Sequence, residues 1–190
     1  MTFPYHRRQV TIRLAIALLA AVMISCGSPA TSGNTAEDAL SRGLQAHAAG
    51  KLDEATTAYF ETLAKDSKNK FAFYNLGVIA QGQGRAAAAE SYYRLAIEQD
   101  AKMTSALFNL AILRGVAGAN QESADLYRRV IAVEPNNAAA HFNLGLVLRL
   151  LGQTAEAQTQ LTKAQQLDAK LVAPSPSASP ARQASPSPTR

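Results

Sequence analysis

The chain has 190 residues, enough for one ordinary domain with terminal extensions. Charged residues make up only 17% of it, Trp is absent and there is one Cys, and the abundance of alanine and leucine favours close-packed helices over a sheet. The formal net charge of +5 comes from arginines near the two ends, because residues 36–171 hold 14 basic and 14 acidic residues. A nucleic-acid-binding surface needs clustered positive charge, so no nucleic-acid partner is expected.

The first element along the chain has the pattern of a targeting segment. Arg7, Arg8 and Arg13 precede an uncharged apolar run over residues 14–24. Such a run is too short to cross a hydrocarbon core about 30 Å thick, which needs about 20 helical residues. The basic flank and the short apolar run therefore predict a signal peptide over residues 1–25.

The end of this segment resembles a bacterial lipobox. The residues are Met23-Ile24-Ser25-Cys26, with Met where Leu is usual. The resemblance implies that Cys26 is lipidated and becomes the mature N-terminus, anchoring the chain to a membrane through a flexible tether over residues 26–35. The alternative is an ordinary cysteine beside a non-lipid cleavage site or an uncleaved anchor. The lipidated form would be exported and held on the outer side of the cytoplasmic membrane or in the outer membrane of a bacterial envelope.

Four repeats of 34 residues follow, over 36–69, 70–103, 104–137 and 138–171. Self-similarity at this period predicts stacked helical hairpins, none of which buries its apolar face alone. A glycine at the fifteenth position would close each hairpin in the left-handed conformation. Small residues at the eighth and twentieth positions would let the two helices approach closely. The residues that set the register are Gly50, Gly84, Gly118 and Gly152 at position fifteen, Gly43, Gly77, Ala111 and Gly145 at position eight, and Ala55, Ala89, Ser123 and Ala157 at position twenty.

These repeats resemble tetratricopeptide repeats across 136 of the 190 residues. Further marks are the recurring Asn-Leu-Gly and the aromatic residue at position twenty-four, whereas the terminal proline survives only at Pro135. The resemblance implies an all-α, right-handed α-α superhelical solenoid of four helix–turn–helix units. It also implies a protein-binding scaffold that is not an enzyme.

The ends of the array differ from its middle. Arg42 occupies a position that holds leucine in the other repeats, and the last helix is unusually polar. Leu161 and Leu167 are expected to leave an apolar strip on that helix, which would offer a surface for self-association into a homo-oligomer. Residues 172–190, rich in Pro and Ser, are expected to be a disordered tail because they hold almost no large apolar side chains to bury.

No catalytic, metal or cofactor pattern is present. His47 and His141 have no second His or Cys at ligand spacing, and no phosphate-binding glycine loop occurs. We therefore expect neither a metal nor a cofactor.

The resemblance places the binding surface on the concave side, formed by the first helix of each repeat. Three asparagines recur at one repeat position, and a side-chain amide can pair with a partner's backbone. Aromatic and aliphatic neighbours would supply contact area for a peptide or helix. The alternative is that the asparagines bond to their own helices and the aromatics belong partly to the core. The candidate groove residues are Tyr74, Asn75, Val78, Gln81, Phe108, Asn109, Ile112, Phe142, Asn143, Leu146 and Arg149.

The leading hypothesis is a membrane-anchored scaffold that binds a segment of a partner protein in this groove and assists assembly of an envelope complex. One alternative is a structural protein that self-associates through its last repeat. Another is a non-catalytic subunit of an envelope enzyme complex.

Overall fold

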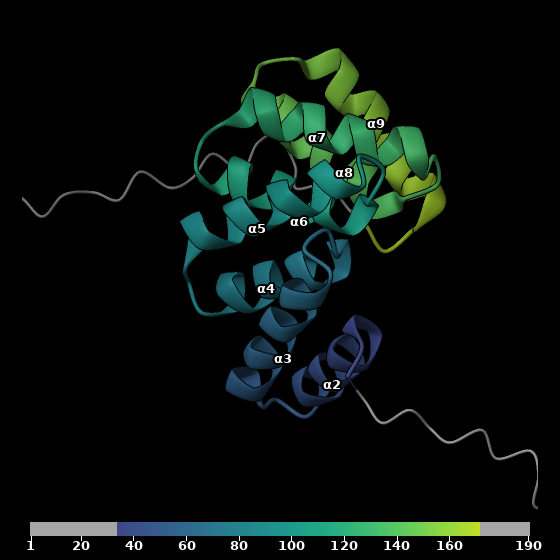
Figure 1. Cartoon of the computed structure of the whole chain (residues 1–190). Helices are drawn as coiled ribbons and strands as arrows, with labels where there is room; N and C mark the ends of the chain where they lie inside the picture. Colours follow the sequence, from purple (N-terminus) through teal and green to yellow (C-terminus); the bar gives the residue numbers. More distant parts are fainter. Residues whose placement is uncertain (1–33, 172–190) are drawn as a thin grey trace, which may run out of the picture.

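Eight α-helices and no strand make up residues 34–171, the part of the chain that the computed structural model describes. This confirms the all-α superhelical repeat fold, which runs from α2 at one end to α9 at the other (Figure 1). The predicted signal peptide, Cys26, nearly all of the tether and the tail lie outside the described residues. The helices are α2 (Ala36–Ala48), α3 (Leu52–Lys65), α4 (Lys70–Gly82), α5 (Ala86–Gln99), α6 (Thr104–Val116), α7 (Asn120–Val133), α8 (Ala138–Leu150) and α9 (Thr154–Leu167).

The helices pair into hairpins that repeat with a constant spacing. Each first helix has 13 residues and each second helix has 14, and equivalent helices begin 34 residues apart. The second helix of each hairpin packs against the first helix of the next, which stacks the four hairpins in chain order. Within residues 34–171, no helix is long and apolar enough to span a membrane.

Each hairpin turn closes on a glycine in the left-handed region. The φ angles are 73° at Gly50, 71° at Gly84, 79° at Gly118 and 74° at Gly152, and no other residue type in the described part has positive φ. Residues with a Cβ rarely adopt these angles, so the glycines end the first helix where the sequence predicted.

Three of the first helices begin with a side-chain cap. Thr35 forms a reciprocal capping box with Asp38, and Asn69 and Asn137 each accept a hydrogen bond from a backbone N–H in the first turn. Such caps satisfy backbone donors that have no partner inside the helix. At the equivalent position before α6, Met103 makes no cap and is instead buried in the core.

The small residue at position eight makes room for the large side chain at position twenty-four. A Cβ at Gly43 would lie 2.6 Å from Cε1 of Tyr59, and a Cβ at Gly77 would lie 2.6 Å from Cε1 of Tyr93. Real Cβ atoms do not approach other atoms so closely. The aromatic ring therefore lies across the bare backbone of the first helix, and both tyrosines are fully buried.

The third hairpin solves the same contact differently. Ala111 replaces the glycine, and the Ser123 hydroxyl donates a 2.7 Å hydrogen bond to the Ala111 carbonyl. Tyr127 packs edge-on against Phe108, with 5.4 Å between ring centroids. A serine hydroxyl and an aromatic pair thus link α6 to α7 where the glycine is missing.

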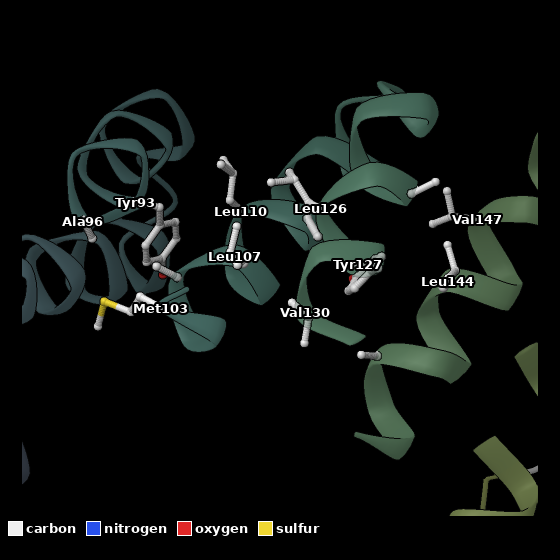
Figure 2. Close-up of a cluster of buried hydrophobic side chains, with 14 of the residues drawn as sticks. Tyr93, Ala96, Met103, Leu107, Leu110, Leu126, Tyr127, Val130, Leu144 and Val147 are labelled. Atoms are coloured by element: carbon white, nitrogen blue, oxygen red, sulfur yellow. The ribbon is translucent and has the colours of Figure 1, made fainter. Parts of the chain in front are cut away.

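The buried side chains fall into two clusters. The larger one extends from α4 to α9, and its side chains include Tyr93, Leu110, Tyr127 and Leu144 (Figure 2). The smaller one lies around the first two repeats and consists of Ala55, Tyr59, Ala72, Leu76 and Ile79.

An alternating ion-pair ring joins the second and third repeats. Arg94 pairs with Glu90 at 2.9 Å and with Glu122 at 2.7 Å, and Arg114 pairs with the same two carboxylates at 2.9 and 2.7 Å. The ring therefore connects α5, α6 and α7. We call Glu90, Arg94, Arg114 and Glu122 the charged tetrad.

Both ends of the array carry polar faces. At the first end, Arg42 pairs with Glu61 at a position where the other repeats bury leucine. At the last end, the outer face of α9 presents Gln158, Thr162 and Lys163. The expectation of an apolar strip was wrong for Leu161, which is only 7% exposed because it packs against the backbone at Gly145. Leu167 is half-buried.

Candidate protein-binding groove

The resemblance to tetratricopeptide repeats implies that repeat positions two, five, six, nine, twelve and thirteen face the groove, and all of these positions lie on the first helix of each hairpin. Each of the eleven residues predicted for the groove is half-buried, so each is accessible in part and packed in part. The structure places them as Tyr74, Asn75, Val78 and Gln81 on α4, Phe108, Asn109 and Ile112 on α6, and Phe142, Asn143, Leu146 and Arg149 on α8.

A cavity of about 340 Å³ is lined by residues from three of these first helices. Its lining includes Tyr74 from α4, Phe108 and Asn109 from α6, and Ala139 from α8. Glu134, in the turn before α8, lies at its edge. The cavity thus combines aromatic rings, two side-chain amides and one carboxylate from three consecutive repeats.

The carboxylate at this edge is held in its ionised form. Glu134 accepts hydrogen bonds from the Thr104 hydroxyl at 2.5 Å and from Asn137 Nδ2 at 2.7 Å. The Thr104 bond and then the Asn137 bond lower the pKa of Glu134 below its usual range. Sequence reasoning missed Glu134, although the acidic residue recurs at this position as Asp66, Asp100 and Asp168.

The asparagine ladder is partly engaged inside the protein. Asn75 Nδ2 donates to the Phe71 carbonyl at 2.8 Å, and Asn109 Nδ2 donates to the Tyr93 hydroxyl at 3.3 Å. The side chain of Asn143 has no hydrogen bond to another residue within 34–171. The three amides are therefore not equivalent, and Asn143 is the one best able to bond to a ligand.

Tyr93 connects three helices beneath the groove. Its hydroxyl donates to Gln81 Oε1 at 2.7 Å and accepts from Asn109, which ties α5 to α4 and α6. Gln81, one of the predicted groove residues, is therefore held by its own hairpin. The first repeat has a longer version of this contact, 3.4 Å between the Tyr59 hydroxyl and His47 Nδ1.

Sequence reasoning missed this bridge. A tyrosine at position twenty-four coincides with a polar partner at position twelve in the first two repeats only, since the third repeat has Gly115 at position twelve and the fourth has Leu161 at position twenty-four. That pairing was the signal that could have predicted it.

Position nine carries an aliphatic side chain in every repeat. Position nine holds Val78, Ile112 and Leu146, and also Leu44 in the first repeat, which is 46% exposed. The candidate residues omitted Leu44, although the repeat spacing places it at this position.

Position thirteen adds the most exposed apolar side chains of the described residues. Val116 is 84% exposed and Leu150 is 71% exposed, and they occupy equivalent positions in neighbouring repeats. Both were missing from the predicted residues, although position thirteen was among those expected to face the groove. The groove and its edge are thus more apolar than the prediction.

Few charges accompany this apolar surface. Across the six groove positions of all four repeats, only Glu37 and Arg149 are charged, and they belong to the first and last repeats. Within residues 34–171, no group of three or more His, Cys, Asp or Glu side chains could hold a metal ion. The arrangement therefore suits contact with an uncharged or amphipathic protein segment.

Comparisons with known proteins agree with this architecture. Two tetratricopeptide-repeat family models match the chain, one over residues 40–104 and the other over residues 126–159, which together exceed half of its length. No curated protein sequence matches it.

Solved structures share the fold. A crystal structure of MamA is 20% identical with a TM-score of 0.66, and the match covers 90% of this chain and 98% of that one. A MamA fragment from Desulfovibrio magneticus RS-1 is 17% identical with a TM-score of 0.66, covering 73% and 78%. A tetratricopeptide repeat protein from Parabacteroides merdae ATCC 43184 is 22% identical with a TM-score of 0.64, covering 71% and 54%.

The matching repeat models and the eight-helix array lead to one assignment. The chain belongs to the tetratricopeptide-repeat family, whose members typically act as non-catalytic scaffolds for protein–protein interaction.

Proposed function

We propose that this protein is a lipid-anchored scaffold of a bacterial envelope, whose concave groove binds an apolar or amphipathic segment of a partner and assists assembly of an envelope complex. The composition of the groove is the observation that supports this binding function. It combines an uncharged aliphatic row at position nine, aromatic rings at position five and a cavity of about 340 Å³ across α4, α6 and α8.

The groove is preformed, which favours binding. The Tyr93 bridge fixes α4, α5 and α6 relative to one another, so the scaffold loses little conformational freedom when a ligand enters. Burying the exposed parts of the aliphatic row then contributes about 25 cal/mol for each Å² of apolar surface. Asn143 and Glu134 supply the polar contacts that would orient the segment.

The groove is tested by cross-linking followed by an affinity measurement. A photoreactive amino acid at Val116 or Leu150 in bacterial cells should cross-link a defined segment of one exported protein. That segment, made as a peptide, should bind the purified protein at least tenfold more weakly after Asn75→Ala, Asn109→Ala and Asn143→Ala are combined. Helicity measured by circular dichroism should be unchanged.

Exposed polar residues on the second helices provide the matched control. Gln121→Ala combined with Gln158→Ala should leave the affinity for the same peptide unchanged, because neither side chain lies on a first helix. If the triple asparagine variant bound the peptide as tightly as the native protein, the groove would not be the site.

The lipid anchor is a separate part of the proposal, and its support is the sequence Met23-Ile24-Ser25-Cys26 after a short apolar run. Expression in a bacterial host should yield a membrane-bound chain that begins at Cys26 and carries acyl groups. Cys26→Ser should abolish both the acylation and the cleavage. Intact mass measurement of the membrane fraction distinguishes these states, and an unmodified native chain would rule the anchor out.

A further inference from the structure

The side of the array formed by the second helices has three equivalent junctions, one between each pair of neighbouring repeats. Because the repeats keep a constant 34-residue register, each side chain at one junction has a counterpart at the other two. The junction between the first and second repeats differs from the others in charge. We call the space between α3 and α5 the first furrow, and its residues are Phe60, Leu63, Ala88, Tyr92 and Leu95.

The geometry of such a furrow is visible at the next junction. A cavity of about 380 Å³ lies between α5 and α7, with Leu110 of α6 in its lining. Its walls are charged, and the Arg94–Glu122 ion pair of 2.7 Å joins the two walls. An equivalent ion pair crosses the third junction, where Arg128 pairs with Glu156 at 3.1 Å.

The first furrow lacks an equivalent ion pair between its walls. Phe60 stands in place of Arg94 and Ala88 in place of Glu122, so no ion pair can form across it. Leu95 stands in place of Arg129, which lines the cavity at the second junction. All five charged residues of that cavity are uncharged here, because Ala64 and Ser91 replace Glu98 and Asp125.

The first furrow is also exposed. Phe60 is 49% exposed and Leu95 is 36% exposed, two of the few large apolar side chains of the described residues that face solvent. Leu63 and Tyr92 are half-buried, and Tyr92 packs against both core clusters. An aromatic wall above a half-buried apolar floor is the usual form of a contact site for another protein.

No charged residue occupies the first furrow. Glu61 lies on the other side of α3, in a cavity with Arg42 and Glu54, and Glu90 pairs with both arginines of the charged tetrad at the second junction. A charged ligand group entering the furrow would lose hydration without gaining an opposite charge. The occupant should therefore be uncharged where it touches the furrow.

The size of the furrow favours a single helix over a second copy of the chain. Helices α3 and α5 have 14 residues each, which gives walls about 21 Å long at about 1.5 Å per residue. Contact along walls of that length buries a few hundred Å², whereas each subunit of a stable dimer buries about 800 Å². A helix of about four turns would match the length of the walls.

We propose that the first furrow is a second protein-binding surface, separate from the concave groove, which takes one amphipathic helix of a partner whose apolar stripe is bordered by uncharged side chains. Phe60 and Leu95 would insert beside that stripe, and Tyr92 would form the floor. The chain would then join two partners, one on each face of the array.

The test installs the ion pair of the other junctions. Phe60→Arg combined with Ala88→Glu should preserve the fold, because Arg and Glu occupy these positions at both later junctions. The probe is an acetylated and amidated peptide of about 18 residues, with leucine at the a and d positions of each heptad and alanine or glutamine elsewhere. Its binding to the full chain is followed by fluorescence anisotropy.

The native chain should bind this peptide, and Phe60→Arg/Ala88→Glu should weaken the binding at least tenfold. The triple asparagine variant of the concave groove should bind it nearly as the native chain does. Binding that is lost in that variant but kept in Phe60→Arg/Ala88→Glu would assign the peptide to the concave groove and overturn the proposal. Equal affinity for Phe60→Arg/Ala88→Glu, or no binding by the native chain at about 1 mM peptide, would overturn the proposal. Sedimentation of the native chain and Phe60→Arg/Ala88→Glu tests the competing occupant, since a dimer lost in that variant would identify a second copy instead.

Discussion

At the scale of single residues, the contact between Gly77 and Tyr93 shows how one missing methyl group controls a hairpin. A Cβ at Gly77 would lie 2.6 Å from the tyrosine ring, whereas a Cβ at Gly82 of the same helix would meet nothing within 4 Å. The two glycines of α4 therefore form a matched pair, one required by packing and one not.

Substituting these glycines should shift stability in opposite directions. We predict that Gly77→Ala lowers the free energy of unfolding by about 1–3 kcal/mol through overpacking. Gly82→Ala should raise it by about 0.5–1 kcal/mol, because alanine restricts the unfolded chain and favours the helix. Urea unfolding at neutral pH measures both, and a gain in stability for Gly77→Ala would contradict the packing argument.

The buried tyrosines also make stability depend on alkaline pH. Burial raises the pKa of Tyr59, Tyr93 and Tyr127 to about 12, whereas a tyrosine in the unfolded chain titrates near 10. Between these values the unfolded chain releases protons that the folded chain retains, so the free energy of unfolding is unaffected below pH ~10 and falls as the pH rises from there toward 12.

Removing one buried tyrosine hydroxyl should make the free energy of unfolding depend less steeply on alkaline pH. Tyr93→Phe should lower the free energy of unfolding by about 0.5–1.5 kcal/mol at pH 7, because the hydrogen bond to Gln81 disappears. Its unfolding free energy should then fall less steeply than that of the native protein between about pH 10 and 11. Urea titrations at a series of pH values give both slopes, and identical slopes would show that Tyr93 does not titrate as described.

At the level of helices, the charged tetrad adds ion pairs between α5, α6 and α7, which also share the larger core cluster. Its Arg114 side chain is 24% exposed and its Glu90 side chain 29% exposed, so solvent screens these pairs less than it screens fully exposed ones. Hydrogen bonds from Arg94 and then Arg114 lower the pKa of Glu90. The stabilisation from this carboxylate is therefore present above about pH 4.3 and is lost as the pH falls below it.

Replacing Arg114 should reveal this coupling. Arg114→Met keeps the apolar stem and removes both ion pairs, and we expect it to lower the free energy of unfolding at low ionic strength. The loss should shrink in 1 M salt and below about pH 4. Arg128→Met, which leaves the tetrad intact, is the control and should have a smaller effect. Chemical unfolding at two salt concentrations decides between them.

At the scale of the whole molecule, the four hairpins are not equally secured. The first belongs mainly to the smaller core cluster, its junction with the second lacks an ion pair across the furrow, and its outer face is polar. The last hairpin, also terminal, contributes Leu144, Val147 and Leu148 to the larger cluster. The array should therefore open from its N-terminal end.

Hydrogen exchange should show that order. We predict that the amides of α2 and α3 exchange faster than those of α8 and α9, while α5, α6 and α7 exchange slowest. Phe60→Arg combined with Ala88→Glu should slow exchange in α3 by adding the missing pair. Mass spectrometry of peptic fragments resolves these helices, and faster exchange in α9 than in α3 would contradict the prediction.

The polar ends also bear on self-association. Gln158, Thr162 and Lys163 cover the outer face of α9, and Leu161 lies beneath them against Gly145. A homo-oligomer built on that helix would bury polar groups and would gain little apolar contact. Most of the exposed large apolar side chains lie elsewhere, in the groove, at its edge and in the first furrow, which favours these surfaces for partners.

The repeat fold could be predicted from the amino-acid pattern alone. Its 34-residue period carries glycines at the turns and small residues beneath large ones, and both features are local and strictly periodic. The need for a glycine at positive φ, and the burial of an apolar stripe at helical spacing, can both be recognised from the residues of a single hairpin. This is why the turns at Gly50, Gly84, Gly118 and Gly152 could be predicted before the structure was known.

Which side chains remain available to a partner follows instead from how the hairpins stack. Gln81 and Asn109 have the right repeat positions for the groove, but their polar atoms meet the Tyr93 hydroxyl, which lies 12 and 16 residues away in the chain. In the sequence, Phe60 resembles an ordinary helix residue. Only the stacked junctions show that its counterparts Arg94 and Arg128 form ion pairs between repeats. Exposure and hydrogen bonding depend on neighbours brought together by stacking, and a repeat position alone does not specify those neighbours.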